Sequence, residues 1–130
     1  MRMRHSLPIL LALVLLCGGA AFAAPYDHNA TVAVMRANVA RMQAIKTAAA
    51  AGDFNAAAQA FFDYAKAAQS EMLMDPPKGS KDDWMATWQS FVDQAYRGVG
   101  ACADRDGPKV LKALDDLVNI NKHGHATFRF

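Results

Sequence analysis

Hydrophobic positions recur every three or four residues in four stretches of the chain, which is the repeat of amphipathic helices. The first stretch spans about residues 29–51, with the apolar stripe Val32, Met35, Val39, Met42 and Ala49. The second follows Asp53, with Phe54, Ala57, Phe61, Tyr64, Ala65 and Ala68. The third follows Ser80, with Trp84, Trp88, Phe91, Val92, Ala95, Val99 and Cys102. The fourth begins at Pro108, with Val110, Leu114, Leu117, Asn121, Gly124 and Phe128.

Helix-breaking and capping residues separate these stretches. Gly52 suits the left-handed end of the first helix, and Asp53 and Ser80 can cap the second and third by accepting hydrogen bonds from first-turn amides. Residues 75–79, Asp-Pro-Pro-Lys-Gly, cannot continue a helix because each proline lacks an amide proton and restricts the residue before it. Residues 104–108 break the pattern again. Four amphipathic helices with short connections predict an all-α, antiparallel up-down-up-down four-helix bundle.

The beginning of the 130-residue chain has a different pattern. Two arginines precede an apolar run at 7–16, which is too short to span a bilayer. Ala21 and Ala23 then supply the small residues that a signal peptidase requires. We therefore predict that residues 1–23 are a cleaved signal peptide and that residues 24–130 form one domain in the periplasm.

Removing the signal peptide changes the charge of the protein. The whole chain has 14 basic and 12 acidic residues, and two of the basic ones lie in residues 1–23, so the mature protein is formally neutral. Its charge does not favour a nucleic-acid or anionic-membrane partner. Cys102 is the single cysteine after the signal peptide, which excludes an internal disulfide, and its place on an apolar stripe favours a buried thiol. Because no catalytic triad, phosphate loop or inward carboxylate pair is evident, we predict that the protein is not an enzyme.

An imidazole and a thioether are predicted to meet near one end of the bundle. At 1.5 Å per residue, antiparallel packing puts Met35 and His125 at similar heights. His125 falls roughly 50° from the centre of its stripe and His123 roughly 145° away, so His125 is expected to point inward and His123 toward water. Methionine and histidine can be the axial ligands of a haem iron, and Arg129 can pair with a haem propionate. The alternative is that the methionine fills the core and the histidine makes only a hydrogen bond.

Four segments resemble the cytochrome c′ family, and together they span most of residues 24–130. Residues 125–129, His-Ala-Thr-Phe-Arg, are similar to the family's C-terminal close, where a Cys-x-x-Cys-His motif is followed by an aromatic residue and arginine. Residues 52–57 resemble its first interhelical turn, and residues 77–80 resemble its central loop. Residues 88–91, Trp-Gln-Ser-Phe, resemble the Trp-x-x-Phe of its third helix.

The chain departs from that family at the haem-attachment motif. Asn121 and Gly124 stand where the family has its two cysteines, which excludes covalent attachment of haem c. The related cytochrome b562 family binds haem without cysteines, through a methionine early in the first helix and a histidine near the C-terminus, and Met35 and His125 match those places. The resemblance implies non-covalent binding of haem b, electron transfer with a periplasmic redox partner, and a homodimer, since cytochrome c′ relatives are often dimers.

Two other functions remain open at this point. A metal such as copper has four candidate ligands, His28, Met35, His123 and His125, if the N-terminal segment folds back toward the C-terminus. No two of these residues have the i, i+4 spacing that places ligands on one helix face. A bundle with neither haem nor metal would instead be an interaction or structural protein.

Overall fold

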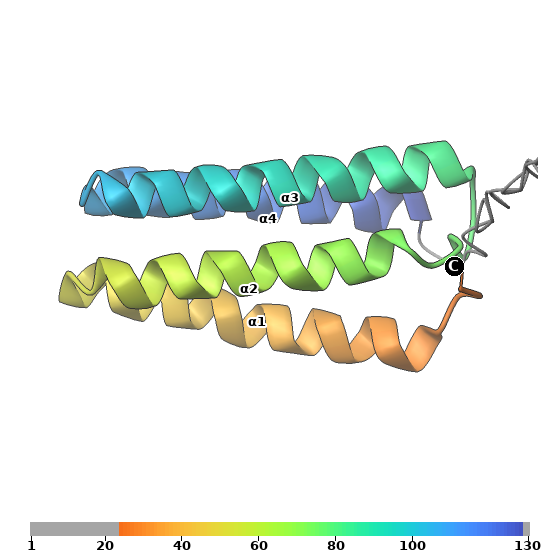
Figure 1. Cartoon of the computed structure of the whole chain (residues 1–130), viewed down its shortest axis with the longest axis horizontal. Coiled ribbons are helices and arrows are strands. Elements are labelled where there is room, and N and C mark those ends of the chain that lie inside the picture. Colours follow the sequence, from red (N-terminus) through yellow and green to blue (C-terminus); the bar gives the residue numbers. More distant parts are fainter. Residues whose placement is uncertain (1–23, 129–130) are drawn as a thin grey trace, which may run out of the picture.

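The computed structural model of the protein describes residues 24–128 and contains four helices in that range: α1 (His28–Ala51), α2 (Phe54–Met72), α3 (Lys81–Ala103) and α4 (Gly107–Phe128). The prediction of an all-helical, four-helix architecture is confirmed. The helices lie side by side as a bundle, and their connections fall at alternate ends (Figure 1). The beginning of α1, the α2–α3 connection and the end of α4 share one end (Figure 1). The predicted signal peptide, residues 1–23, lies outside the described residues.

Local hydrogen bonds explain where the helices begin and end. Gly52 ends α1 with a left-handed φ of 69°, which glycine adopts without a steric penalty. The carboxylate of Asp53 accepts a hydrogen bond from a first-turn amide of α2 at 3.0 Å, and the hydroxyl of Ser80 does the same for α3 at 3.1 Å. Asp27 and Asp106 cap α1 and α4 in the same way. These two caps, which the sequence pattern did not identify, make both helices begin one residue earlier than predicted.

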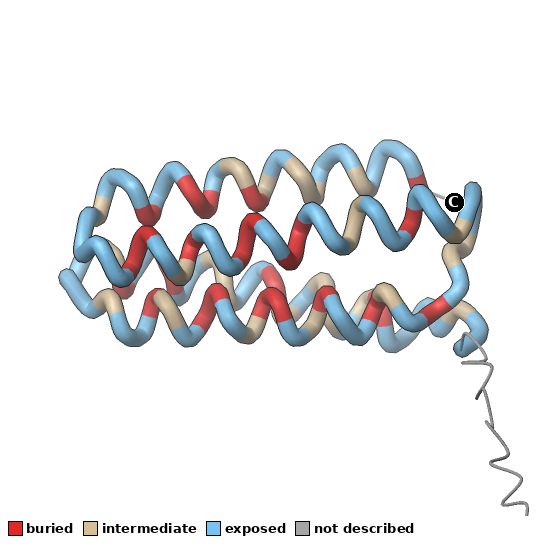
Figure 2. Tube along the Cα trace, turned by 45° about the horizontal axis from the view of Figure 1, so that its top comes forward, coloured by how far each residue is buried: buried red, intermediate tan, exposed pale blue. Residues whose placement is uncertain are grey.

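The core lies between the inward faces of the helices, where buried positions recur along each helix (Figure 2). The packing of α2 against α3 is the most extensive in the bundle. Phe61 of α2 is fully buried against Gly98 of α3, at a point where a side chain on residue 98 would overlap the phenyl ring. The predicted faces of α2, α3 and α4 are confirmed, with most of their residues buried and Phe54, Trp88, Val99, Asn121 and Gly124 half-buried.

The predicted apolar stripe of α1 is wrong as a description of its buried face. The buried residues of α1 are Thr31, Asn38, Ile45 and Ala48, whereas Val39 is 63% exposed. Thr31 and Asn38 can be buried because their side chains have partners: the Thr31 hydroxyl donates to Glu71 Oε2 at 2.9 Å, and Asn38 Oδ1 accepts from the Arg41 guanidinium at 2.7 Å. Polar residues therefore occupy the seam of α1, and its apolar stripe is turned partly toward solvent.

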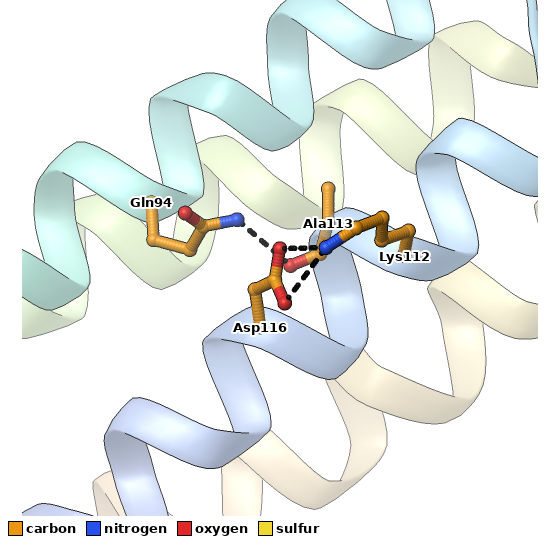
Figure 3. A network of polar contacts seen from close by, with 4 residues as sticks. All are labelled: Gln94, Lys112, Ala113 and Asp116. Atoms are coloured by element: carbon orange, nitrogen blue, oxygen red, sulfur yellow. Dashed lines mark hydrogen bonds and ion pairs between the residues drawn. The ribbon is translucent and has the colours of Figure 1, made fainter.

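A buried amide connects α3 to α4. The Gln94 side chain points from α3 toward α4 and donates to the backbone carbonyl of Ala113 at 3.1 Å (Figure 3). Lys112, the residue before Ala113, forms an exposed i, i+4 ion pair with Asp116 within α4 (Figure 3). The buried hydrogen bond joins α3 to α4, whereas the ion pair lies within α4. Exposed ion pairs of this spacing contribute only about 0.3–0.5 kcal/mol.

Within residues 24–128, no helix combines the length and the apolar character needed to cross a membrane.

Candidate functional site

The groove between α1 and α4 contains the larger of two adjoining cavities. α1 and α4 pack less extensively than the other three neighbouring helix pairs. The space between them holds a cavity of about 360 Å³, a size within the range of about 300–1,000 Å³ typical of small-molecule sites. Its lining is mainly apolar and includes Met35, Val39 and Met42 from α1 and Leu117 and Val118 from α4. Three residues of the apolar stripe predicted for α1, Met35, Val39 and Met42, therefore border this groove, and Met42 also packs against the core.

The smaller cavity, of about 150 Å³, has aromatic walls. Trp84, Trp88 and Phe91 of α3 and Phe128 of α4 line it. They contact one another edge to face, with ring centroids 5.5 Å apart for the two tryptophans and 5.1 Å apart for Trp84 and Phe128. The indole N–H of Trp84 donates to the backbone carbonyl of Glu71 at 3.1 Å. The aromatic walls are held in fixed orientations by these contacts.

Met35 and His125 both border both cavities, so the two predicted ligand residues line the same groove. Phe91 and Asn121 are the other two residues shared by the two linings. Met35 is half-buried on α1. His125 was expected to point inward, but it is exposed, because it lies in the last turn of α4 at the rim of the groove. The site is thus a solvent-accessible groove with a thioether on one wall and an imidazole at its rim.

The other predicted site residues lie elsewhere. His28 contacts Tyr26, with 3.5 Å between the Tyr26 hydroxyl and His28 Nδ1, and borders a shallow depression between the beginning of α1 and the end of α2. His123 is exposed and lines neither cavity of the groove. Among residues 24–128, no three His, Cys, Asp or Glu side chains are close enough together to hold a metal ion. The alternative copper cluster of His28, Met35, His123 and His125 stays a prediction, and Arg129 lies outside the described residues.

The residues of the groove fit a non-covalently bound haem. Thioether sulfur and imidazole nitrogen are established axial ligands of haem iron, and the remaining lining is mostly apolar and aromatic, which suits a porphyrin. Lys122 borders the larger cavity and can pair with a propionate. Asn121 and Gly124, the two positions that the cytochrome resemblance compares with attachment cysteines, both border the smaller cavity and cannot form thioether bonds. A side chain at Gly124 would come within 3.3 Å of Thr87, so the glycine allows α3 and α4 to approach closely here.

A buried carboxylic acid behind the smaller cavity was missed from the sequence. Glu71 of α2 is 1% exposed, and its Oε2 accepts the hydrogen bond from Thr31, which itself lines the cavity. Burial raises the pKa of Glu71, although the Thr31 hydrogen bond acts in the opposite direction. The signal for it was present, because residue 71 continues the alternating spacing of Ala57, Phe61, Tyr64 and Ala68 on the buried face of α2.

Comparison with protein-family models, with curated proteins and with solved structures finds no match for this chain. The cytochrome resemblance of the sequence therefore stays a prediction, and the functional argument depends on the groove itself.

Proposed function

We propose that this chain is an exported, non-enzymatic electron carrier: an antiparallel up-down-up-down bundle that binds haem b non-covalently in the groove between α1 and α4. Met35 and His125 are its proposed axial ligands. The observation that carries the proposal is that these two side chains, 90 positions apart in the sequence, border the same two cavities. When bound, a haem iron supplies reversible one-electron chemistry, and a thioether ligand raises its reduction potential.

The groove supports this proposal by the apolar surface that it leaves uncovered. Val39 is 63% exposed although Met35, Val39 and Met42 form an apolar stripe of α1 beside a cavity. Covering such surface is favourable by about 25 cal/mol per Å². A flat apolar ligand in the groove would remove this stripe from water, together with Val118 of the facing helix. The aromatic rings of the smaller cavity would limit access of water to one side of the ligand.

The polar residues of the groove have separate proposed roles. Met35 and His125 hold the iron, and Lys122 pairs with a propionate at the solvent edge. Arg129, one turn beyond His125 in the sequence, is a second candidate for a propionate. Because the lining of the two cavities contains no acidic side chain, it offers no charge repulsion to the propionates.

Titration of the purified protein with haem tests the proposal. We expect uptake of one haem per chain, with a sharp Soret band and split bands in the reduced state. Met35→Ala and His125→Ala should each lose or shift this spectrum. His123→Ala is the matched control, because His123 lies on the same helix but lines neither cavity. Failure to bind one equivalent of haem, or an unchanged spectrum in His125→Ala, would refute the proposed site.

Export is tested separately by mass spectrometry of the protein recovered from the periplasm of a host cell. We expect a chain that begins at Ala24. A protein that still contains residues 1–23, or that is recovered only from the cytoplasm, would contradict the proposed signal peptide. Neither result would affect the haem titration.

The alternative is a haem-free bundle that acts through its surface, and one observation favours it. Phe62 of α2 and Tyr96 of α3 are 42% and 45% exposed and contact each other, with ring centroids 6.4 Å apart and Lys66 above the Phe62 ring. Exposed aromatic pairs are typical of interaction surfaces. Sedimentation of the wild type and of Phe62→Ser tests whether this face forms the predicted homodimer. A monomeric wild type would exclude the homodimer.

A further inference from the structure

The first residues of the described chain form a short strap across the end of α2. The backbone N–H of Ala24 donates to the carbonyl of Leu73 at 3.1 Å, and the carbonyl of Ala24 accepts from the N–H of Asp75 at 2.8 Å. Two residues later, Tyr26 borders the smaller cavity of the groove, and Asp27 caps α1. The strap thus connects the turn after α2 to both the beginning of α1 and the cavity wall.

The end of α2 lacks the positive charge that stabilises a helix C-terminus. The negative end of the helix dipole favours a nearby cation, yet the last turn of α2 has no basic residue and contains the buried acid Glu71. Lys81, at the beginning of α3, supplies part of the missing charge. Its amine donates to the carbonyl of Met74 and lies 3.7 Å from the Asp75 carboxylate. The carbonyl of Leu73, the residue that caps α2, has the backbone nitrogen of Ala24 as its partner.

We propose that the ammonium group created when the signal peptide is cleaved after Ala23 is a structural charge, docked on the carbonyl of Leu73 at the C-terminus of α2. This inference rests on the export proposed above. Cleavage converts the Ala24 amide into an ammonium, which keeps the bond to Leu73 and becomes charge-assisted. Ala24 is exposed, so water can satisfy the remaining two protons. Processing would therefore fix the strap that carries Tyr26 onto the cavity.

The charged groups around this position favour a cation on balance. Asp75 is adjacent in the same turn, and Asp27 lies three residues along the strap. Lys81 is paired with Asp75, so these two charges largely offset each other and Asp27 leaves the balance acidic. A positive charge at Ala24 thus adds to a site that contains more acidic than basic groups.

The experiment compares the melting temperature of the mature protein with and without the charge on Ala24. The wild type is purified with Ala24 as its first residue. A second form carries Gly-Ser inserted before Ala24, which retains the hydrogen bond from the Ala24 N–H to the Leu73 carbonyl but moves the charge. Each form is then acetylated at its amino terminus near pH ~6.5, where lysines are spared because their pKa is about 10.4, against about 7.7–8.0 for an α-amine.

We expect acetylation to lower the melting temperature of the Ala24 form by about 2–5 °C, a shift expected when a helix-dipole charge is lost from a domain of this size. Acetylation of the Gly-Ser form should change it by less than about 1 °C. Equal shifts in the two forms, or no shift in either, would overturn the proposal. If the periplasmic protein does not begin at Ala24, the cleavage site is wrong. The Ala24 form is then made from a cleavable fusion, and the docking is tested independently of export.

Discussion

Two glycines of α3 should respond to the same substitution in opposite directions. Gly98 and Gly100 both lie within Lys81–Ala103, two positions apart. A Cβ added at Gly98 would lie 2.6 Å from Cγ of Phe61 and closer still to two other ring atoms, whereas a Cβ at Gly100 would have no heavy atom within 4 Å. The pair therefore separates the effect of packing from the effect of helix propensity.

The magnitudes follow from two opposing contributions. Replacing glycine by alanine in a helix interior stabilises by about 1 kcal/mol. At Gly98 the methyl group must displace the ring of Phe61, which is fully buried, and such overpacking costs about 3 kcal/mol, the upper end of its usual range. Gly98→Ala should thus lower the free energy of unfolding by about 2 kcal/mol, which is about 8–16 °C in melting temperature. Gly100→Ala should raise it by about 1 kcal/mol.

Urea denaturation followed by circular dichroism measures both values. The double variant Gly98→Ala with Phe61→Leu should lose less than the sum of the two single variants, because the smaller leucine removes the overlap and the two residues are in contact. If Gly98→Ala is as stable as the wild type, the close contact of α2 with α3 at this point is wrong. If Gly100→Ala is destabilised to the same extent, packing is not the cause.

Three further outcomes are expected. Because burial raises the pKa of Glu71, the folded protein keeps that proton to higher pH than the unfolded chain does. The free energy of unfolding should fall as pH rises from the ordinary glutamate pKa through the folded one, by up to about 1.4 kcal/mol per pH unit, and Glu71→Gln should flatten this slope in pH-dependent denaturation. Tyr64→Phe should cost about 1 kcal/mol in the same assay, since its hydroxyl donates to the carbonyl of Asn38 at 2.6 Å; an unchanged value would exclude a contribution from that bond. Cys102 is buried and burial raises the pKa of its thiol, so it should react with a thiol reagent only as fast as the protein unfolds, and rapid labelling of the native state would contradict its burial.

The fold was largely predictable because its signals are local. Gly52, Asp53 and Ser80 act on residues within one turn of themselves, and the apolar faces of α2, α3 and α4 repeat at the helical period. The face of α1 was not predictable in this way. Val39 is more hydrophobic than Asn38, yet Asn38 is buried and Val39 is exposed. Asn38 is buried because Arg41 donates to its side chain and Tyr64 of α2 donates to its backbone carbonyl.

The candidate site was predictable in part. The rise per residue of a helix placed Met35 and His125 at the same end of the bundle, and the angular spacing of helical residues placed His125 near the inward face. Both residues border the same cavities. Three features could not be predicted without knowing the distances of α1 from α4 and of α1 from α2. They are the exposure of His125, the presence of Lys122 at the groove and the burial of Glu71. Helical periodicity gives the direction of a side chain from its own axis, but not the distance to the next helix.

The sequence by itself determined four helices, the segments that separate them, and the absence of the cysteines that attach haem c, since each of these depends on residue chemistry or on interactions within a turn. Only the tertiary structure decided that the apolar stripe of α1 borders an open groove, that Gly98 must lack a side chain, and that Ala24 reaches the end of α2. These features are set by the distances between helices, and those distances depend on how all the side chains at each interface pack together.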